Sequence, residues 1–126
     1  MRTRRGQEGV SLLEALAAIS LFAIVSSAVG ALALGSVRST ALSRHSAEAA
    51  MLAQWQMEQV RGLDYADMAS SSSTATMGGQ TFTITTDVQT DVPDANMKDV
   101  KVTVTWTGPE GTKSFSTESI YVDVTL

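Results

Sequence analysis

A run of 23 residues without a charge, from Ala15 to Val37, constrains this chain more than any other feature. At a rise of about 1.5 Å per residue, a helix of that length spans the hydrocarbon core of a membrane, which is about 30 Å thick. A core helix of a water-soluble domain would show polar residues every three or four positions, whereas only Ser, Gly and Ala interrupt the larger apolar residues here. The run therefore predicts a membrane span.

Glu14 stands near the start of this apolar segment, where an unpaired carboxylate costs at least about 2.5 kcal/mol. No Lys or Arg lies within one helical turn of Glu14, so the charge needs a partner from outside the helix, or the group must be neutral. A free amine created by cleavage after Gly9 would be such a cation. Within one straight helix that amine lies several ångströms away and points elsewhere, so the amine of a neighbouring copy is the better candidate.

The charges on the two sides of the span indicate its orientation. Arg2, Arg4 and Arg5 precede it, and the 126-residue chain has a formal net charge of −4, which becomes −6 if the first nine residues, with three Arg and one Glu, are removed. This places the N-terminus in the cytoplasm and the acidic C-terminal part outside, and it argues against nucleic acid as a partner. The chain has no cysteine, which excludes disulfides and thiolate metal sites.

The segment Gly9-Val10-Ser11-Leu12-Leu13-Glu14, which follows the basic leader and opens the apolar run, resembles the cleavage and methylation segment of type IV prepilins and type II secretion pseudopilins. Val10 replaces the Phe that is commoner in that family. The resemblance implies cleavage by prepilin peptidase between Gly9 and Val10, N-methylation of Val10 and a role for Glu14 in subunit assembly. It further implies other pilins or pseudopilins and an inner-membrane assembly platform as partners, and a location in the bacterial inner membrane and then in a pilus or pseudopilus.

Two functions from different classes remain open. In the first, the chain is a minor pilin or minor pseudopilin that enters or primes a fibre; in the second, it is a signal-anchored periplasmic binding module that never polymerises. The N-terminal segment does not fit a secretory signal peptide. Such a peptide is cleaved after a shorter apolar region, whereas the expected cleavage site here precedes the run. No enzymatic activity and no cofactor are expected. A hydrolytic triad has little support, since His45 is the only histidine and no GxSxG motif is present.

The sequence predicts four regions: a leader at 1–9, a transmembrane and assembly helix at 10–37, an amphipathic half of the same helix at 38–63, and a periplasmic sheet domain at 64–126. One helix of about 50 residues is expected, because no Pro interrupts it. Gly62 is its natural stop. The apolar residues of its second half are Leu42, Ala49, Met51, Leu52, Trp55, Val60 and Leu63. A row of small residues at four-residue steps, which suits close helix packing but also arises by chance in Ala-rich helices, is Ala23, Ser27, Ala31 and Gly35.

The sheet domain is predicted to begin with an irregular Ser- and Gly-rich loop at 69–80, because this stretch lacks periodicity. From Thr81 the apolar period becomes two, which predicts three half-buried strands. Their apolar residues are Phe82, Ile84 and Val88, then Val100, Val102, Val104 and Trp106, then Ile120, Val122, Val124 and Leu126. The apolar parity changes after Phe115, which predicts a bulge or bend near Thr117 or Glu118. The fold class is α+β, with the helix packed on a small antiparallel sheet, as the resemblance also implies.

The remaining chemistry-bearing residues are expected to have structural roles. His45, with no second ligand at metal spacing, is expected to be a solvated helix residue. Residues expected to fill the core between helix and sheet are Met51, Trp55, Met57 and Met68. Residues expected to lie in a solvated acidic loop, without the Glu and Gly of an EF-hand calcium site, are Asp87, Asp91, Asp94 and Asp99. No metal site is predicted.

Overall fold

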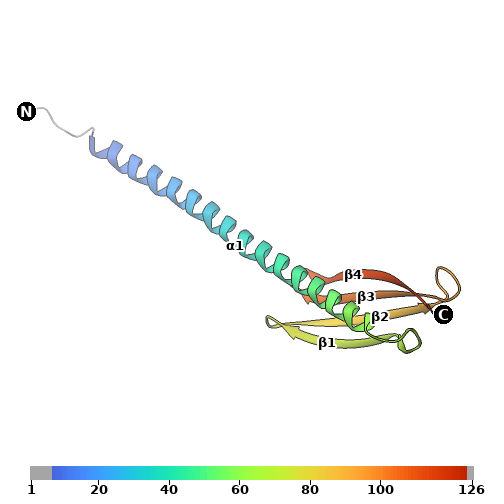
Figure 1. Ribbon diagram of the computed structural model, residues 1–126. Coiled ribbons are helices and arrows are strands. Elements are labelled where there is room, and N and C mark those ends of the chain that lie inside the picture. Colours follow the sequence, from blue (N-terminus) through green and yellow to red (C-terminus); the bar gives the residue numbers. More distant parts are fainter. Residues whose placement is uncertain (1–6, 125–126) are drawn as a thin grey trace, which may run out of the picture. The chain divides into compact units, whose positions relative to one another are not determined.

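The computed structural model describes residues 7–124, which form one long helix and a four-stranded antiparallel sheet in the order β1-β2-β3-β4 (Figure 1). The elements are α1 (Gln7–Arg61), a short 3-10 helix η1 (Tyr65–Asp67), β1 (Ser71–Met77), β2 (Gln80–Thr90), β3 (Met97–Gly108) and β4 (Gly111–Val122). The chain divides into two compact units, Met1–Ala41 and Leu42–Leu126, and α1 contributes to both. The predicted α+β class is confirmed, with four strands instead of three.

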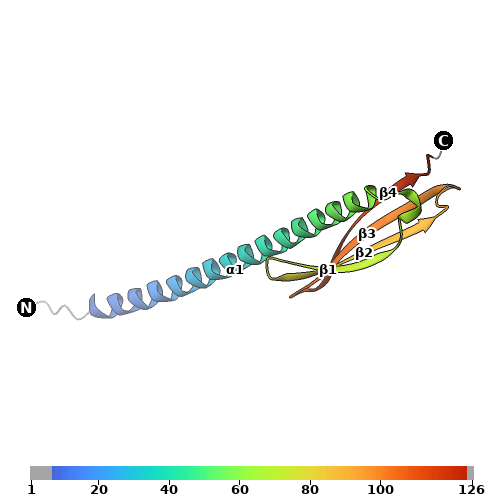
Figure 2. The same ribbon diagram turned by 60° about the horizontal axis from the view of Figure 1, so that its bottom comes forward.

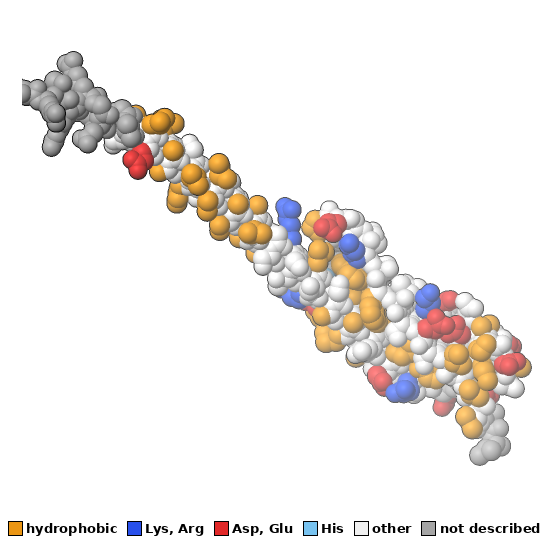
Figure 3. All heavy atoms as spheres, turned by 90° about the horizontal axis from the view of Figure 1, so that it is seen from above, with side chains coloured by type: hydrophobic (Ala, Val, Ile, Leu, Met, Phe, Trp, Pro, Cys, Tyr) orange, Lys and Arg blue, Asp and Glu red, His pale blue; other side chains and the backbone are white. Residues whose placement is uncertain are grey.

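The part of α1 in the first unit presents its apolar side chains to the surroundings. Phe22 and Leu32 are both 74% exposed, and every described side chain from Ser11 to Ala41 is classed as exposed. Hydrophobic and uncharged side chains cover most of this segment (Figure 3). By length and composition the helix can cross a membrane. Such a surface is unfavourable in water, because apolar area costs free energy wherever it meets the solvent.

In the second unit, the helix packs along one face of the sheet (Figure 2). The main cluster of buried residues consists of Ala49, Leu52 and Ala53 from α1 with Phe82, Ile84, Val102, Val104 and Trp106 from the sheet. A second cluster is formed by Val60, Met68 and Val100. The predicted buried face of the middle strand is therefore confirmed. The helix ends where Gly62 predicted it, and the Gly62 N–H donates to the carbonyls of Glu58 and Gln59, both at 3.2 Å.

For two residues of α1, the prediction that they lie in the core is wrong. Met57 packs against both clusters and Met68 is buried, but Met51 is 51% and Trp55 is 55% exposed. Each of these two lies two positions from the fully buried Ala53, and two steps of about 100° carry a side chain to the far side of a helix. The apolar stripe that faces the sheet is therefore narrower than the sequence suggested. Leu63, which is 47% exposed, lies beyond the end of the helix at Arg61.

The Ser-rich stretch predicted as an irregular loop at 69–80 contains strand β1 instead. Ser71–Met77 pairs with β2 from Ser71↔Thr86 to Met77↔Gln80. Gly78 and Gly79 form the two-residue hairpin turn with φ of +56° and +80°, a conformation that glycine adopts without steric cost. Of the β1 side chains, only Ala75 and Met77 pack against the core, so the strand lacks the apolar alternation by which a strand is recognised in a sequence.

The bulge predicted near Thr117 is also wrong. The β3–β4 register runs without interruption from Gly108↔Gly111 to Met97↔Val122. The two-residue turn between Gly108 and Gly111 fixes this register, and Phe115, opposite Val104, then lies on the core face. Ile120 and Val122 consequently point away from the core, and each is 52% exposed.

Candidate functional site: the first turns of the long helix

The sequence places its candidate site at the beginning of α1. The backbone of Gly9 and Val10 lies within the helix, which starts at Gln7, but the side chain of Val10 lies outside the described part of the chain. Leu12 is 68% and Leu13 is 72% exposed, so the first described turn is already a surface of apolar side chains. The proposed scissile bond between Gly9 and Val10 therefore directly precedes the segment that needs an apolar environment.

Glu14 lies on this surface with its carboxylate exposed. Val10 is one helical turn before it, at a rise of about 6 Å along the axis. Among the described residues 7–124, no hydrogen bond or ion pair involves Glu14. An exposed carboxylate on an apolar helix can accept hydrogen bonds from a cation supplied by a second molecule, and in lipid such a partner would remove the cost of an isolated charge.

A family model described as the prokaryotic N-terminal methylation motif matches residues 4–30. The chain carries the prepilin signature of type IV pilins and pseudopilins. This range contains Gly9, Val10 and Glu14, and it ends inside the apolar run. The motif supports a pilin- or pseudopilin-type substrate of prepilin peptidase, and it points to a structural subunit that assembles with other pilins. No curated protein and no solved structure matches the chain.

The apolar helix and the prepilin motif together fit a pilin anchored in the inner membrane. The two features overlap, because the matched range 4–30 includes the first part of the apolar run, and the run continues beyond it to Val37. The roles of Gly9 and Val10 in processing and of Glu14 in assembly remain proposals.

His45 differs from its predicted solvated position. Its side chain is only 19% exposed, its Nδ1 lies 3.1 Å from the carboxylate of Glu48, and its ring meets the edge of Phe82 at 6.3 Å between centroids. Arg44 pairs with the other oxygen of Glu48 at 3.4 Å and donates to the carbonyl of Gly78 at 3.3 Å. This group of side chains ties the β1–β2 turn to α1, so His45 has a structural role.

The acidic residues of the sheet domain do not converge. Asp87 is exposed on β2, Asp91 and Asp94 are exposed between β2 and β3, and Asp99 is half-buried on β3. Within residues 7–124, no group of three or more His, Asp or Glu side chains could hold a metal ion. Loss of solvent around the phenol, with the carboxylates of Asp91 and Asp123, raises the pKa of Tyr65 above its ordinary value.

Proposed function

We propose that the chain is a minor type IV pilin or minor pseudopilin. Prepilin peptidase cuts after Gly9, and the new N-terminal residue Val10 is N-methylated. The mature protein sits in the inner membrane as a single-pass subunit with its sheet domain in the periplasm. It then enters, or primes, a pilus or a type II secretion pseudopilus. The observation that carries this proposal is the prepilin motif at the start of an exposed apolar helix that also bears Glu14, which has no partner among residues 7–124.

Cleavage and assembly are linked through charge. Before cleavage, the chain has no free amine at Val10; after it, the Val10 amine carries a positive charge, and methylation keeps that charge. The Glu14 carboxylate of one subunit accepts hydrogen bonds from the Val10 amine of a neighbour. A monomer in the membrane pays the cost of an unpaired carboxylate, at least about 2.5 kcal/mol, and the growing fibre removes it. Assembly is therefore favoured over the dispersed monomers.

The minor role is supported by the small cysteine-free sheet, whereas Glu14 bears on the position of the subunit in the fibre. A subunit at the very tip of a fibre has no neighbour above it to provide an amine. A subunit that keeps the carboxylate is expected to have a neighbour beyond it, which places this chain below the tip.

The test replaces Glu14 and follows incorporation. Glu14→Leu removes the charge from the apolar segment, so we expect normal membrane insertion, largely normal cleavage, and little or no variant in sheared fibres or in complexes with partner pilins. Glu58→Leu is the matched control, because Glu58 lies on the same helix beyond the span and pairs with Arg61 at 3.2 Å on the exposed surface. Wild-type incorporation of Glu14→Leu would show that the carboxylate does not act in assembly.

A further inference from the structure

At one end of the sheet, the two central strands β2 and β3 are no longer paired with each other. The β2–β3 ladder stops at the pair Phe82↔Trp106, although β2 begins two residues earlier at Gln80 and β3 continues to Gly108. Over the same region, β1–β2 stays paired to Met77↔Gln80 and β3–β4 to Gly108↔Gly111. The two hairpins therefore part from each other near their turns. The Thr81 carbonyl accepts a hydrogen bond from the side chain of Gln80 at 3.1 Å instead.

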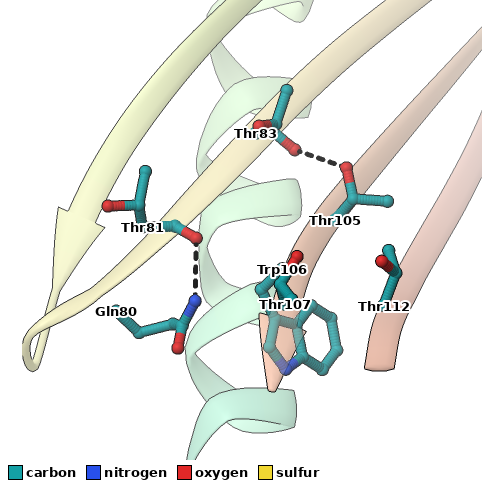
Figure 4. Close-up of a pocket in the computed structure, with 7 residues that line it drawn as sticks. All are labelled: Gln80, Thr81, Thr83, Thr105, Trp106, Thr107 and Thr112. Atoms are coloured by element: carbon teal, nitrogen blue, oxygen red, sulfur yellow. Dashed lines mark hydrogen bonds between the residues drawn. The ribbon is translucent and has the colours of Figure 1, made fainter. Parts of the chain in front are cut away.

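A notch of about 350 Å³ occupies this gap (Figure 4). It is lined by Gln80, Thr81, Thr83, Thr105, Trp106, Thr107 and Thr112. The five Thr residues belong to the outer face of the sheet, whereas Gln80 and Trp106 alternate with them and belong to the core face. Side chains from both faces can line one cavity only where neighbouring strands separate, so the notch follows from the end of the ladder. Its volume lies at the lower end of the range for small-molecule sites.

The lining is polar and carries no formal charge. Each Thr hydroxyl can both donate and accept a hydrogen bond, and the Gln80 amide adds a carbonyl acceptor. The hydroxyl of Thr105 donates to the backbone carbonyl of Thr83 at 3.4 Å, while the hydroxyl of Thr83 has no partner among the described residues. Trp106 is only 6% exposed, and its indole N–H donates to no acceptor in residues 7–124. The notch therefore offers unused donors and acceptors beside an aromatic ring.

This lining selects among classes of ligand. An anion would find no Lys or Arg in the notch, and a cation would find no carboxylate. A purely apolar ligand would cover hydroxyls without replacing their hydrogen bonds to water, which costs free energy. A neutral molecule rich in hydroxyl groups satisfies the Thr side chains, and its apolar C–H face can contact the edge of Trp106. An uncharged sugar has these properties.

We propose that the notch between the β1–β2 and β3–β4 hairpins binds one or two rings of an uncharged saccharide. Thr83, Thr105 and the indole N–H of Trp106 supply the hydrogen bonds. This activity is independent of the proposed role in fibre assembly, because all the residues involved belong to the sheet and none belongs to the prepilin motif at residues 4–30. A failure of either proposal therefore leaves the other standing.

The test uses Trp106 as its own reporter. The chain contains two Trp residues, so Trp55→Phe, at an exposed position, leaves Trp106 as the only indole. The full chain is prepared in lauryldimethylamine oxide, because a glycoside detergent would compete for the site. Cellobiose, maltotriose and N,N′-diacetylchitobiose serve as neutral probes, and trigalacturonate serves as an anionic probe. We expect a saturable change in Trp106 emission with at least one neutral probe and none with trigalacturonate.

Two hydroxyl-to-methyl variants locate the effect. Thr83→Val, which removes a lining hydroxyl while keeping the side-chain shape, is expected to weaken the apparent affinity roughly tenfold, the effect of losing one good hydrogen bond. Thr85→Val is the matched control, being the next outward-facing residue of β2 and outside the lining. Melting curves establish that both variants fold. The proposal is overturned if no neutral probe gives a saturable change, if trigalacturonate binds as well, or if both variants weaken binding equally.

Discussion

A carboxylate placed in the middle of the sheet tests the core most severely. Val102 is fully buried on β3, and the residues beside it in the register are Thr86 on β2 and Thr117 on β4, neither of which is basic. Lys98, on the same face of β3, is four residues or about 13 Å away. Its Nζ already donates to the carbonyls of Tyr65 and Met68, at 2.6 and 3.1 Å. Val102→Asp would therefore create a buried acid without a cationic partner.

The loss in free energy of unfolding can be calculated from the cost of keeping that acid neutral. An Asp with an unfolded pKa of about 3.9 that stays protonated in the core at pH 7 costs about 4 kcal/mol, at about 1.36 kcal/mol per pH unit. Loss of the buried Val side chain adds about 1.5 kcal/mol. The sum, between about 5 and 6 kcal/mol, is comparable to the whole stability of a small domain, about 5–15 kcal/mol. We expect Val102→Asp to lose much of the stability of the sheet domain at pH 7, so that it unfolds at a far lower urea concentration than the unsubstituted chain.

The pH dependence has a definite sign. Burial raises the folded pKa of the new Asp above its unfolded value, so the lost stability returns as pH falls toward about 3.9 and disappears again as pH rises. Between pH 7 and pH 5 the variant should regain about 2.7 kcal/mol relative to the unsubstituted chain. Urea unfolding of the full chain in micelles, followed by Trp106 emission in the Trp55→Phe background, measures this difference for the sheet domain.

The matched control is Thr103→Asp, one residue along β3 on the outer face, where the neighbours in the register are Thr85 and Ser116. A solvent-facing substitution of this kind should change stability by no more than about 0.5 kcal/mol. If the two variants were equally stable, or if Val102→Asp showed no recovery at pH 5, the assigned facing of β3 would be refuted.

Three further outcomes are expected. Gly9→Leu should leave a full-length precursor on a denaturing gel, because a bulky side chain at the cleavage point hinders the peptidase; normal processing would contradict this. Gly78→Ala should lower the free energy of unfolding by roughly 1–2 kcal/mol, since its φ is +56° and a Cβ there would lie 3.0 Å from Arg44 Nη2; an unchanged urea midpoint would refute the strain. Trp55→Ser should change stability by less than about 0.5 kcal/mol, whereas Phe82→Ala should cost about 3–5 kcal/mol; similar losses in both would mean that Trp55 is buried.

The long helix was predictable because its signals are local. An uninterrupted apolar run, good helix formers without Pro, and Gly62 as the stop together predicted about 50 residues, and α1 has 55. The prepilin motif is equally local, since Gly9 and Glu14 lie in one short segment at the start of the helix. Properties that depend on neighbouring residues in the chain can be recognised from one sequence.

The strands were predictable only where their core face is apolar. Val100, Val102 and Val104 alternate as a half-buried strand should, and they are fully buried. β1 was not predicted because its side chains show no strand pattern. It is a strand through its pairing with β2. The facing of β4 was mistaken because Ile120 and Val122 look like core residues, whereas the turn after Gly108 sets the register and turns them outward.

Surfaces that depend on tertiary packing could not be predicted. Trp55 was predicted to belong to the apolar stripe of the helix, but the sheet covers only the side that contains Ala49 and Ala53. The notch depends on where the ladder between β2 and β3 ends, at Phe82↔Trp106, and no local pattern encodes that position. The Thr residues at every second position of the strands were visible in the sequence, yet they indicate only strands with a solvated face.

The central claim is that the chain is processed as a prepilin, and the chemical state of its N-terminus tests this most directly. Mass spectrometry of the protein isolated from membranes, after proteolytic digestion, identifies the first residue and its modification. The account predicts a peptide that begins at Val10 with one methyl group on its amine. An N-terminus that still carries Met1 and the intact leader would contradict it, and would favour an anchored periplasmic module that never enters a fibre.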